Sequence, residues 1–162
     1  MFRGSLALAN PAAKLAGALG SLVLRRATVG GAEAMLAATR GPGAFSLVSE
    51  SMSARAALYQ SKVTGTLPDI GYIVDGVKFD GFRSGVLLDA KGFGYARFVK
   101  DGEFKRFFGG ADSLVQQAQR QAASARGTPI QWHFAEEAAA GATRTLLERR
   151  GVSGIEVLYT PL

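Results

Sequence analysis

The chain has 162 residues, with 19 lysines and arginines against 13 aspartates and glutamates, no cysteine and one histidine. The absence of cysteine excludes disulfides, thiolate metal sites and a thiol nucleophile, and a single histidine excludes the two-histidine zinc helix of metalloproteases. Any metal ion would therefore be held mainly by oxygen. The length and the 48% content of hydrophobic residues are typical of one compact domain.

The net charge of +6 is spread along the chain and is compatible with a polyanionic partner such as nucleic acid. Lys14 interrupts the only long apolar region, residues 4–24. No uninterrupted run reaches the roughly 18–20 residues that a membrane-spanning helix needs, so we expect no stable membrane span.

The first part of the chain divides at a glycine-rich break. Residues 1–44 are rich in alanine and glycine and end in Gly41-Pro42-Gly43, so we interpret them as a leader or linker with helical segments, followed by a domain over residues 45–162. Apolar residues at helical spacing then predict an amphipathic helix from Phe45 to about Gln60, which carries Glu50.

Two turn signals predict a β-meander after this helix. Asp75-Gly76 separates Gly71–Val74 from Val77–Asp80 and is typical of a two-residue hairpin turn. A third strand, Val86–Lys91, follows Ser84-Gly85. The basic and aromatic stretch over residues 95–108 is compatible with either a helix or irregular structure.

The second half alternates helices and strands. Ser113 to Gln116 fits a capping box, and an apolar stripe of Leu114, Ala118, Ala122 and Ala125 follows it. We predict a helix from Ser113 to Gly127, a strand over 129–134, a helix over 135–150 and a strand over 155–159. This order indicates an α/β fold in which a mixed sheet, the three-strand meander plus two further strands, is flanked by helices.

Charged residues of the meander fall on one face. With the turn at Ser84-Gly85, Asp80 lies opposite Asp89 and Lys78 lies opposite Lys91. Opposed carboxylates with Cβ atoms about 4.5–5.5 Å apart can share one divalent cation, and Mg²⁺ prefers such oxygen ligands. Lys91 would then orient a water molecule or stabilise charge in the transition state of phosphodiester hydrolysis. The alternative is a solvated face in which the acids pair only with Lys78 and Lys91.

Asp80, followed by Asp89-Ala90-Lys91 on a meander after a helix, resembles the PD-(D/E)xK nucleases, which share a restriction-endonuclease-like core. Over residues 45–162 the chain resembles more closely the restriction-endonuclease-fold toxin class called Tox-REase-5. The motifs that carry this resemblance are Tyr59-Gln60, Val63–Gly65, Gly76–Phe82, Leu88–Gly92, Gln117–Gln121, Trp132–Glu136 and Tyr159–Pro161. The proline that often precedes the first acid is replaced by Phe79.

The resemblance implies a metal-dependent nuclease toxin, a DNase with Mg²⁺ or alternatively Mn²⁺ as cofactor. Such domains usually lie at the C-terminus of larger bacterial proteins that act against other bacteria, including type VI secretion effectors. They act in the cytoplasm of a rival cell, and a cognate immunity protein holds them inactive in the producer. Residues 1–44 would then be a linker or a surface for an immunity protein, adaptor or secretion apparatus. An RNase of the same fold and a non-catalytic nucleic-acid or protein-binding module stay open as alternatives.

The resemblance also assigns candidate residues. Asp80, Asp89 and Lys91 match the catalytic acids and lysine, and an acid from the first helix often completes the metal site. Glu50 is the only acid in the predicted first helix, and Gln60 is its rival. Related nucleases place a glutamine from the later helix near the lysine, which suggests Gln117. The candidates for nucleic-acid contact are Lys78, Lys100, Lys105, Arg106, Arg120 and Gln121.

The later helix and the strand after it also carry residues whose placement the pattern predicts. Gln117, Arg120 and Gln121 are expected on a polar helix face opposite the apolar stripe. Trp132 and His133 lie on an apolar strand, so we interpret Trp132 as a core residue and His133 as a structural histidine rather than a general base.

Overall fold

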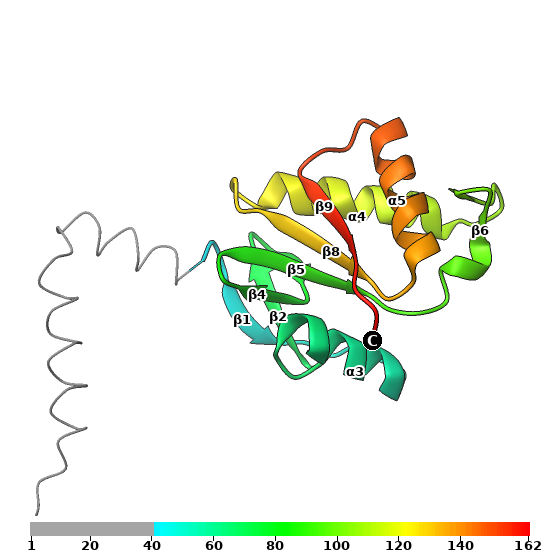
Figure 1. The fold of residues 1–162 in the computed structure, drawn as a ribbon. Helices are drawn as coiled ribbons and strands as arrows, with labels where there is room; N and C mark the ends of the chain where they lie inside the picture. Colours follow the sequence, from blue (N-terminus) through cyan, green and yellow to red (C-terminus); the bar gives the residue numbers. More distant parts are fainter. Residues whose placement is uncertain (1–40) are drawn as a thin grey trace, which may run out of the picture. The chain divides into compact units, whose positions relative to one another are not determined.

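The structure, a computed structural model, describes residues 41–162 as an α/β fold, in agreement with the predicted class (Figure 1). Residues 41–162 belong to one compact unit. The elements in chain order are β1 Ala44–Leu47, α3 Ala54–Thr64, β2 Ile70–Val74, β3 Val77–Phe79, β4 Gly81–Arg83, β5 Val86–Lys91, the 3₁₀ turn η1 Ala96–Phe98, β6 Val99–Lys100, β7 Glu103–Phe104, α4 Gly110–Ser124, β8 Ile130–Phe134, α5 Glu137–Arg149 and β9 Ile155–Tyr159.

The central sheet has the strand order β4-β5-β8-β9, with β4 and β5 antiparallel and the other pairs parallel. The expected mixed sheet is therefore present, but the meander does not lie within one sheet. The long strand predicted to run on from Val77 is interrupted at Asp80. Its first half, β3, pairs with β2 in a separate sheet of order β1-β2-β3, and its second half, β4, pairs with β5.

Both predicted hairpin turns are confirmed. Asp75 and Gly76 have φ angles of 48° and 78°, and Ser84 and Gly85 have φ angles of 52° and 80°. Two successive residues at positive φ give the type I′ geometry that matches the twist of the flanking strands. The pairs Gly81 with Leu88, Phe82 with Leu87 and Arg83 with Val86 are those required by the predicted register around Ser84-Gly85.

The predicted helix over Phe45–Gln60 is wrong in its first half. Residues 44–47 form β1, which pairs with β2, and α3 begins only at Ala54. The side chain of Ser53 accepts a hydrogen bond from the backbone N–H of Ala56, 3.2 Å away. Serine competes for backbone hydrogen bonds and therefore favours a cap over a helix interior. The helix consequently starts after the serine-rich segment, and Glu50 lies in the connection that precedes it.

The folded part includes residues on the leader side of the predicted boundary. Ala44 belongs to β1, and the backbone N–H of Gly43 donates to the Tyr72 hydroxyl at 3.0 Å. The remainder of the predicted leader, residues 1–40, lies outside the described residues.

The later elements follow the prediction with shifted ends. Helix α4 begins at Gly110, so Ser113 lies inside it rather than at its cap, and Gly109 has no capping side chain. Helix α5 and strands β8 and β9 occur within two residues of their predicted bounds. The open stretch over residues 95–108 contains η1, β6 and β7.

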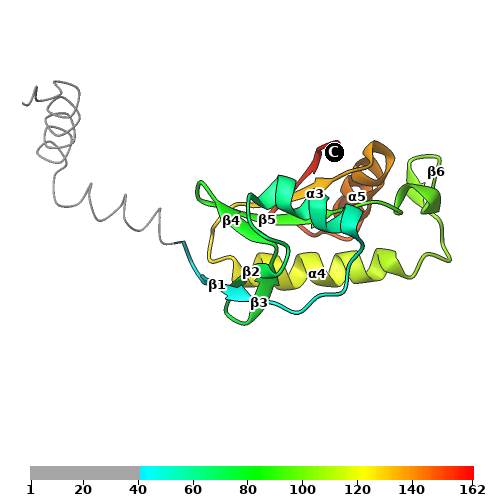
Figure 2. The same ribbon diagram turned by 90° about the horizontal axis from the view of Figure 1, so that it is seen from below.

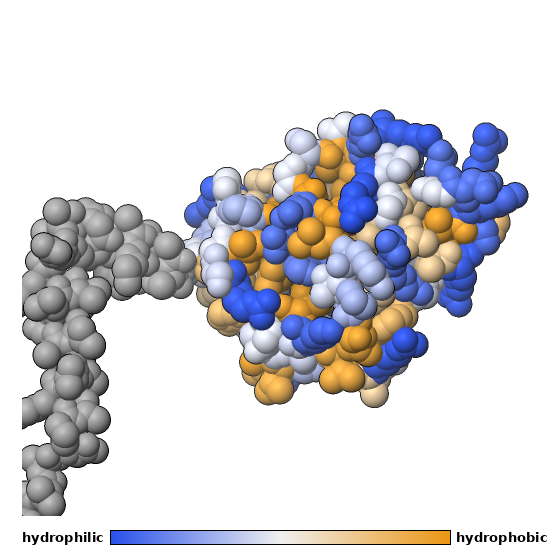
Figure 3. Space-filling view, viewed as in Figure 1, coloured by the Kyte–Doolittle hydropathy of each residue, from blue (hydrophilic) through white to orange (hydrophobic). Residues whose placement is uncertain are grey.

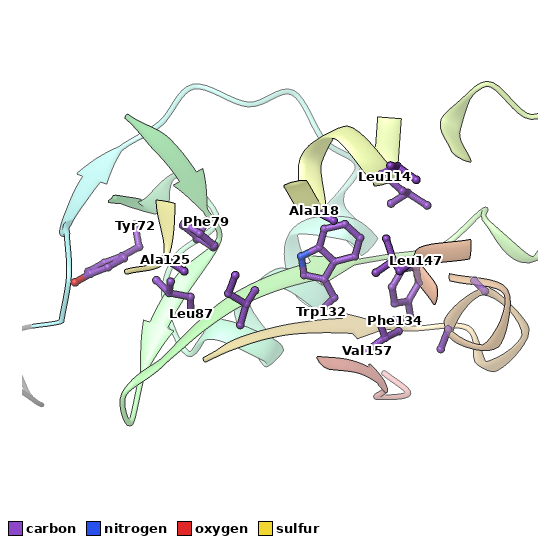
Figure 4. Close-up of a cluster of buried hydrophobic side chains, with 14 of the residues drawn as sticks. Tyr72, Phe79, Leu87, Leu114, Ala118, Ala125, Trp132, Phe134, Leu147 and Val157 are labelled. Carbon is purple, nitrogen blue, oxygen red and sulfur yellow. The ribbon is translucent and has the colours of Figure 1, made fainter. Parts of the chain in front are cut away.

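Helices cover both faces of the central sheet, and Figure 2 shows its strands between α3 and α4. Leu87 packs with Trp132 and Phe134 in the larger core on the α4 and α5 side (Figure 4). Leu88, the next residue of β5, packs with Tyr59 of α3 on the opposite face. Because side chains alternate along a strand, Asp89 and Lys91 share the face of Leu87 and point toward α4.

The surface of the described part is mixed. In Figure 3, hydrophilic residues gather over α5 and the region of β6, and hydrophobic patches lie between hydrophilic ones elsewhere. Within residues 41–162, none of the helices combines the length and apolar character that crossing a bilayer would require.

Candidate active site

Asp80 and Asp89 are held next to each other by the backbone of the β4–β5 hairpin. The Asp80 N–H donates to the Leu88 carbonyl at 2.9 Å, and the Asp80 Oδ2 accepts from the Ala90 N–H at 2.8 Å. Asp80 is 6% exposed and Asp89 is 2% exposed. The break between β3 and β4 therefore places the first acid against the strand that carries the second.

Asp89, Lys91 and Gln117 form a closed triangle of hydrogen bonds. The Lys91 ammonium donates to Asp89 Oδ1 and to Gln117 Oε1, the latter at 2.8 Å. The Gln117 amide nitrogen in turn donates to Asp89 Oδ2 at 2.8 Å. Lys91 is itself buried, at 6% exposure, so its charge is held close to that of Asp89 in a medium that screens it weakly.

Gln121 is the second amide on Asp89. Its nitrogen donates to Asp89 Oδ2 at 2.7 Å and to the Lys78 carbonyl at 3.2 Å, and its oxygen accepts from the Trp132 indole N–H at 2.7 Å. The side chain is fully buried. The prediction that Gln121 contacts nucleic acid from a polar face is therefore wrong. Its position seven residues after Leu114, on the stripe through Ala118, was the signal in the sequence that placed it toward the core.

Lys78 links Glu50 to Asp80. Its ammonium donates to the Glu50 carboxylate and to Asp80 Oδ1, the latter at 3.0 Å. Glu50 thus reaches the site from the connection between β1 and α3 and not, as predicted, from a helix. Lys78 pairs in register with Ile73 of β2, because β3 belongs to the other sheet, and the predicted pairing of Lys78 with Lys91 is absent from the described ladders.

A cavity of about 310 Å³ opens over these groups. It lies where the connection before α3, the end of β5 and helix α4 meet. Gln60 lines it from α3, while its amide nitrogen donates to the Pro68 carbonyl at 3.2 Å. The other lining residues are Glu50, Met52, Ala56, Lys78, Asp80, Asp89, Ala90, Lys91, Gly92, Tyr95 and Gln117.

The electrostatics of the cavity favour a bound cation. Burial and then the charge of Asp89 raise the pKa of Asp80, Lys78, the Ala90 N–H and Lys91 partly oppose the rise, and the net pKa is about 6. Burial lowers the pKa of Lys78, but Asp80 and Glu50 raise it, and on balance it lies above the usual 10.5. The lysines only partly offset the repulsion between the two acids, and a divalent cation between them would reduce it further.

The sequence model of the family described as restriction endonuclease fold toxin 5, Tox-REase-5, matches residues 56–137, about half of the chain. This chain belongs to that family. The match begins in α3 and contains Asp80, Asp89, Lys91, Gln117 and Gln121. A search of curated proteins found no match.

The donor set of this Tox-REase-5 domain fits Mg²⁺. Asp80 and Asp89 offer hard carboxylate oxygens, and Mg²⁺ commonly uses one or two carboxylates and keeps several water ligands. Across residues 41–162, acidic or histidine side chains form no cluster of three or more at a metal-binding separation. The Lys78 ammonium between Glu50 and Asp80 accounts for this, because it occupies the space through which Glu50 would join the pair.

The predicted nucleic-acid contacts divide by exposure. Lys100, Arg106 and Arg120 are exposed on the surface of the domain. Lys105 is half-buried and its ammonium donates to the Arg97 carbonyl at 2.6 Å. The sequence did not single out Arg55. Its guanidinium carbon lies 3.5 Å from the ring centroid of Phe93, and Phe93 directly follows Gly92, which lines the cavity.

Glu136 lies in one of the motifs that carry the family resemblance, but the sequence assigned no role to it. Its Oε2 accepts hydrogen bonds from three consecutive backbone N–H groups, those of Gly94, Tyr95 and Ala96, at 3.0, 2.8 and 2.9 Å. This carboxylate fixes the segment that follows Lys91 and sets the position of Tyr95 at the cavity. No local pattern signals the contact, since about forty residues separate the partners.

His133, predicted to be a structural histidine, has only one of its ring nitrogens partnered. Its Nδ1 lies 2.9 Å from the Thr160 hydroxyl, and its Nε2 is buried with no hydrogen-bond partner among the described residues. Burial, together with the charge of Arg83, lowers the His133 pKa. The ring lies on the face of β8 opposite Trp132, away from the cavity.

Proposed function

We propose that this domain is a metal-dependent nuclease toxin that hydrolyses phosphodiester bonds of DNA. The observation that carries the proposal is the convergence of Asp80, Asp89 and Lys91 in one cavity, with every charged group of the triad anchored by named partners. Membership of a restriction-endonuclease-fold toxin family supports a nuclease over the alternative of a non-catalytic binding module.

Asp80 and Asp89 are the residues that would hold Mg²⁺, or Mn²⁺ in its place. Glu50 is the further acid nearby, and it would join them if the Lys78 ammonium between Glu50 and Asp80 moved aside. The bound ion would lower the pKa of a water molecule and neutralise charge that develops on the phosphoryl oxygens. Asp89 would offer its Oδ1, because its Oδ2 already accepts two amide hydrogen bonds. Asp80 holds its carboxylate toward the same space through the Ala90 N–H.

Lys91 would act on the attacking water or on the scissile phosphate. Its ammonium donates hydrogen bonds to Asp89 and Gln117, which hold it beside the two acids. A cationic donor at this place stabilises the negative charge of the transition state, which is the largest contribution that positioned donors make in such reactions. Gln117 orients Lys91 by accepting a hydrogen bond from one of the three N–H groups of its ammonium.

Basic residues outside the cavity would position the nucleic-acid backbone. Lys100, Arg106 and Arg120 are exposed and would contact phosphates. Contacts to phosphate give affinity and fix the position of the protein on the nucleic acid, but they do not distinguish one base from another. We therefore expect cleavage with little dependence on base sequence, and binding that weakens as the salt concentration rises.

The biological role follows from the same proposal. A nuclease toxin of this family would be delivered to the cytoplasm of a competing bacterium, with a type VI secretion system as one route. In the producing cell, a cognate immunity protein would cover the cavity. Residues 1–44 would connect the domain to the secreted protein or to an adaptor.

The decisive experiment incubates purified protein with supercoiled plasmid DNA, with Mg²⁺, with Mn²⁺ and with EDTA, beside a structured RNA. Asp89→Asn and Lys91→Met should reduce DNA cleavage at least about a hundredfold. Asp101→Asn is the matched control, because Asp101 is exposed in the β6–β7 turn at a φ of 52° that asparagine tolerates. If the protein cleaves RNA and not DNA, the proposed substrate becomes RNA. Full activity of both site variants would refute the assignment of these residues.

A further inference from the structure

The buried Trp132 lies next to the proposed metal ligand Asp89. In the parallel pairing of β5 and β8, Trp132 is the register partner of Asp89, and both side chains point toward α4. Figure 4 shows the Trp132 ring between β8 and α4, close to Ala118. The ring is fully buried and is the only tryptophan of the chain.

Gln121 connects the indole to the carboxylate through both ends of its amide. An indole N–H is only a donor, so it takes the amide oxygen of Gln121, at 2.7 Å. The amide nitrogen is then directed to two acceptors, Asp89 Oδ2 at 2.7 Å and the Lys78 carbonyl at 3.2 Å. With a donor on one side and acceptors on the other, the amide has a single orientation that satisfies all partners.

This orientation decides which oxygen of Asp89 stays available. Oδ2 accepts from both Gln117 and Gln121, which uses the two lone-pair directions of a carboxylate oxygen. Among the described residues, Oδ1 accepts a hydrogen bond only from the Lys91 ammonium, which leaves one of its lone-pair directions available. Without the indole N–H, the buried Gln121 oxygen would lose its partner, and the amide would be held on Oδ2 less firmly.

We propose that Trp132, acting through Gln121, is a positioning residue that presents Asp89 to a metal ion through Oδ1 alone. The proposal rests on the function proposed above, because it assigns the buried hydrogen bonds to metal binding. Trp132 itself touches neither metal nor substrate. Outer partners of this kind typically change metal affinity by about ten- to a hundredfold when they are removed.

Packing alone would not require the indole. Trp132 contacts Phe134 with ring centroids 6.5 Å apart, and the Lys91 ammonium lies 4.6 Å from the Trp132 ring centroid. A phenylalanine at position 132 would keep an aromatic ring in this core and lose the N–H donor. Trp132→Phe therefore separates the hydrogen bond from most of the packing.

The test is a double-mutant cycle on Mn²⁺ affinity, measured by calorimetric titration of the metal-free protein. Trp132→Phe and Gln121→Met should each weaken Mn²⁺ binding about tenfold or more. The double variant should bind no more weakly than the weaker single variant, since both changes remove the same connection. Phe134→Leu is the control: it opens space in the same core and lowers stability, but leaves the Mn²⁺ affinity unchanged.

A second readout does not depend on metal. The single tryptophan gives one indole resonance in a ¹H–¹⁵N correlation spectrum, and Gln121→Met should move it and speed its hydrogen exchange at least tenfold. An unchanged resonance, strictly additive losses of affinity, or unchanged affinity in both single variants would overturn the positioning role while leaving the nuclease intact. If the wild type binds no metal and cleaves nothing, the proposed function fails, and the positioning role fails with it.

Discussion

Asp80 Oδ2 accepts a hydrogen bond at 2.8 Å from the backbone N–H of Ala90, the residue between Asp89 and Lys91. The first acid is thereby tied to the strand that carries the other two groups of the triad. Because the two-residue turn at Ser84-Gly85 sets the pairing of β4 with β5, a shift by one residue would break this bond and turn Asp89 and Lys91 to the opposite face. The register of one hairpin therefore holds the site together.

The metal-free protein should lose stability as the pH rises through about 6. The pKa of Asp80 is about 6 in the folded state against an ordinary 3.8, so the folded chain binds this proton more tightly. The resulting stabilisation is fully present below the ordinary pKa and is lost as the pH passes the folded-state value. Urea unfolding in EDTA between pH 4.5 and 7.5 measures it.

Asp80→Asn supplies the comparison for that titration, since its amide is neutral at every pH. The difference in unfolding free energy between wild type and Asp80→Asn should change by about 2 kcal/mol between pH 4.5 and 7.5, with the wild type relatively weaker at pH 7.5. A difference that stays constant with pH would show that Asp80 does not carry the shifted pKa.

Mg²⁺ should raise the melting temperature more at pH 7.5 than at pH 5. A proton and a metal ion compete for Asp80, so the metal binds the ionised carboxylate and relieves its repulsion with Asp89. Differential scanning fluorimetry with 0 and saturating Mg²⁺ at the two pH values measures the effect. Asp80→Asn should reduce the shift at pH 7.5, whereas Asp101→Asn should show the wild-type shift at both.

The proposed catalytic triad could be located from the sequence because its geometry is local. The Ser84-Gly85 turn fixes the pairing across the hairpin, and strand periodicity then places Asp80, Asp89 and Lys91 on one face. The break at Asp80 was not accessible, because it reflects competition between two sheets: β2 takes the first half of the strand and β5 takes the second. That competition is decided by partners distant in sequence.

The residues that surround the three proposed catalytic groups were harder to predict from the sequence, because their partners are also distant in the sequence. Gln121 was interpreted as part of a polar face, yet its burial depends on Trp132 supplying a donor and Asp89 supplying an acceptor from two other elements. Val48 and Met52 fit a helical period, but the serines around Glu50 and the pairing of β1 with β2 prevail over it. Secondary-structure propensity and hydrophobic periodicity predict local structure poorly where a partner distant in the sequence competes with them.

Glu136→Gln should destabilise the domain and weaken cleavage together. The carboxylate accepts three backbone N–H bonds from Gly94 to Ala96, and hydrogen bonds to a charged acceptor contribute roughly 1.5–3 kcal/mol each. An amide keeps one acceptor oxygen without its charge, so we expect a loss of about 2 kcal/mol in urea unfolding. Glu137→Gln, an exposed neighbour at the start of α5, should change stability by less than about 0.5 kcal/mol.

Glu50→Gln should reduce cleavage without unfolding the domain. Glu50 is exposed and bonds the Lys78 ammonium, whose other partner is Asp80, and a partly exposed ion pair contributes only about 0–1 kcal/mol to stability. If Glu50 completes the metal site, Mn²⁺ affinity and cleavage should each fall about tenfold or more in Glu50→Gln.

Gln60→Leu is the competing variant, because Gln60 lines the same cavity from α3. Its loss of the bond to the Pro68 carbonyl should lower stability, with Mn²⁺ affinity unchanged. The opposite pattern, wild-type affinity in Glu50→Gln and weakened binding in Gln60→Leu, would assign the third position of the site to Gln60.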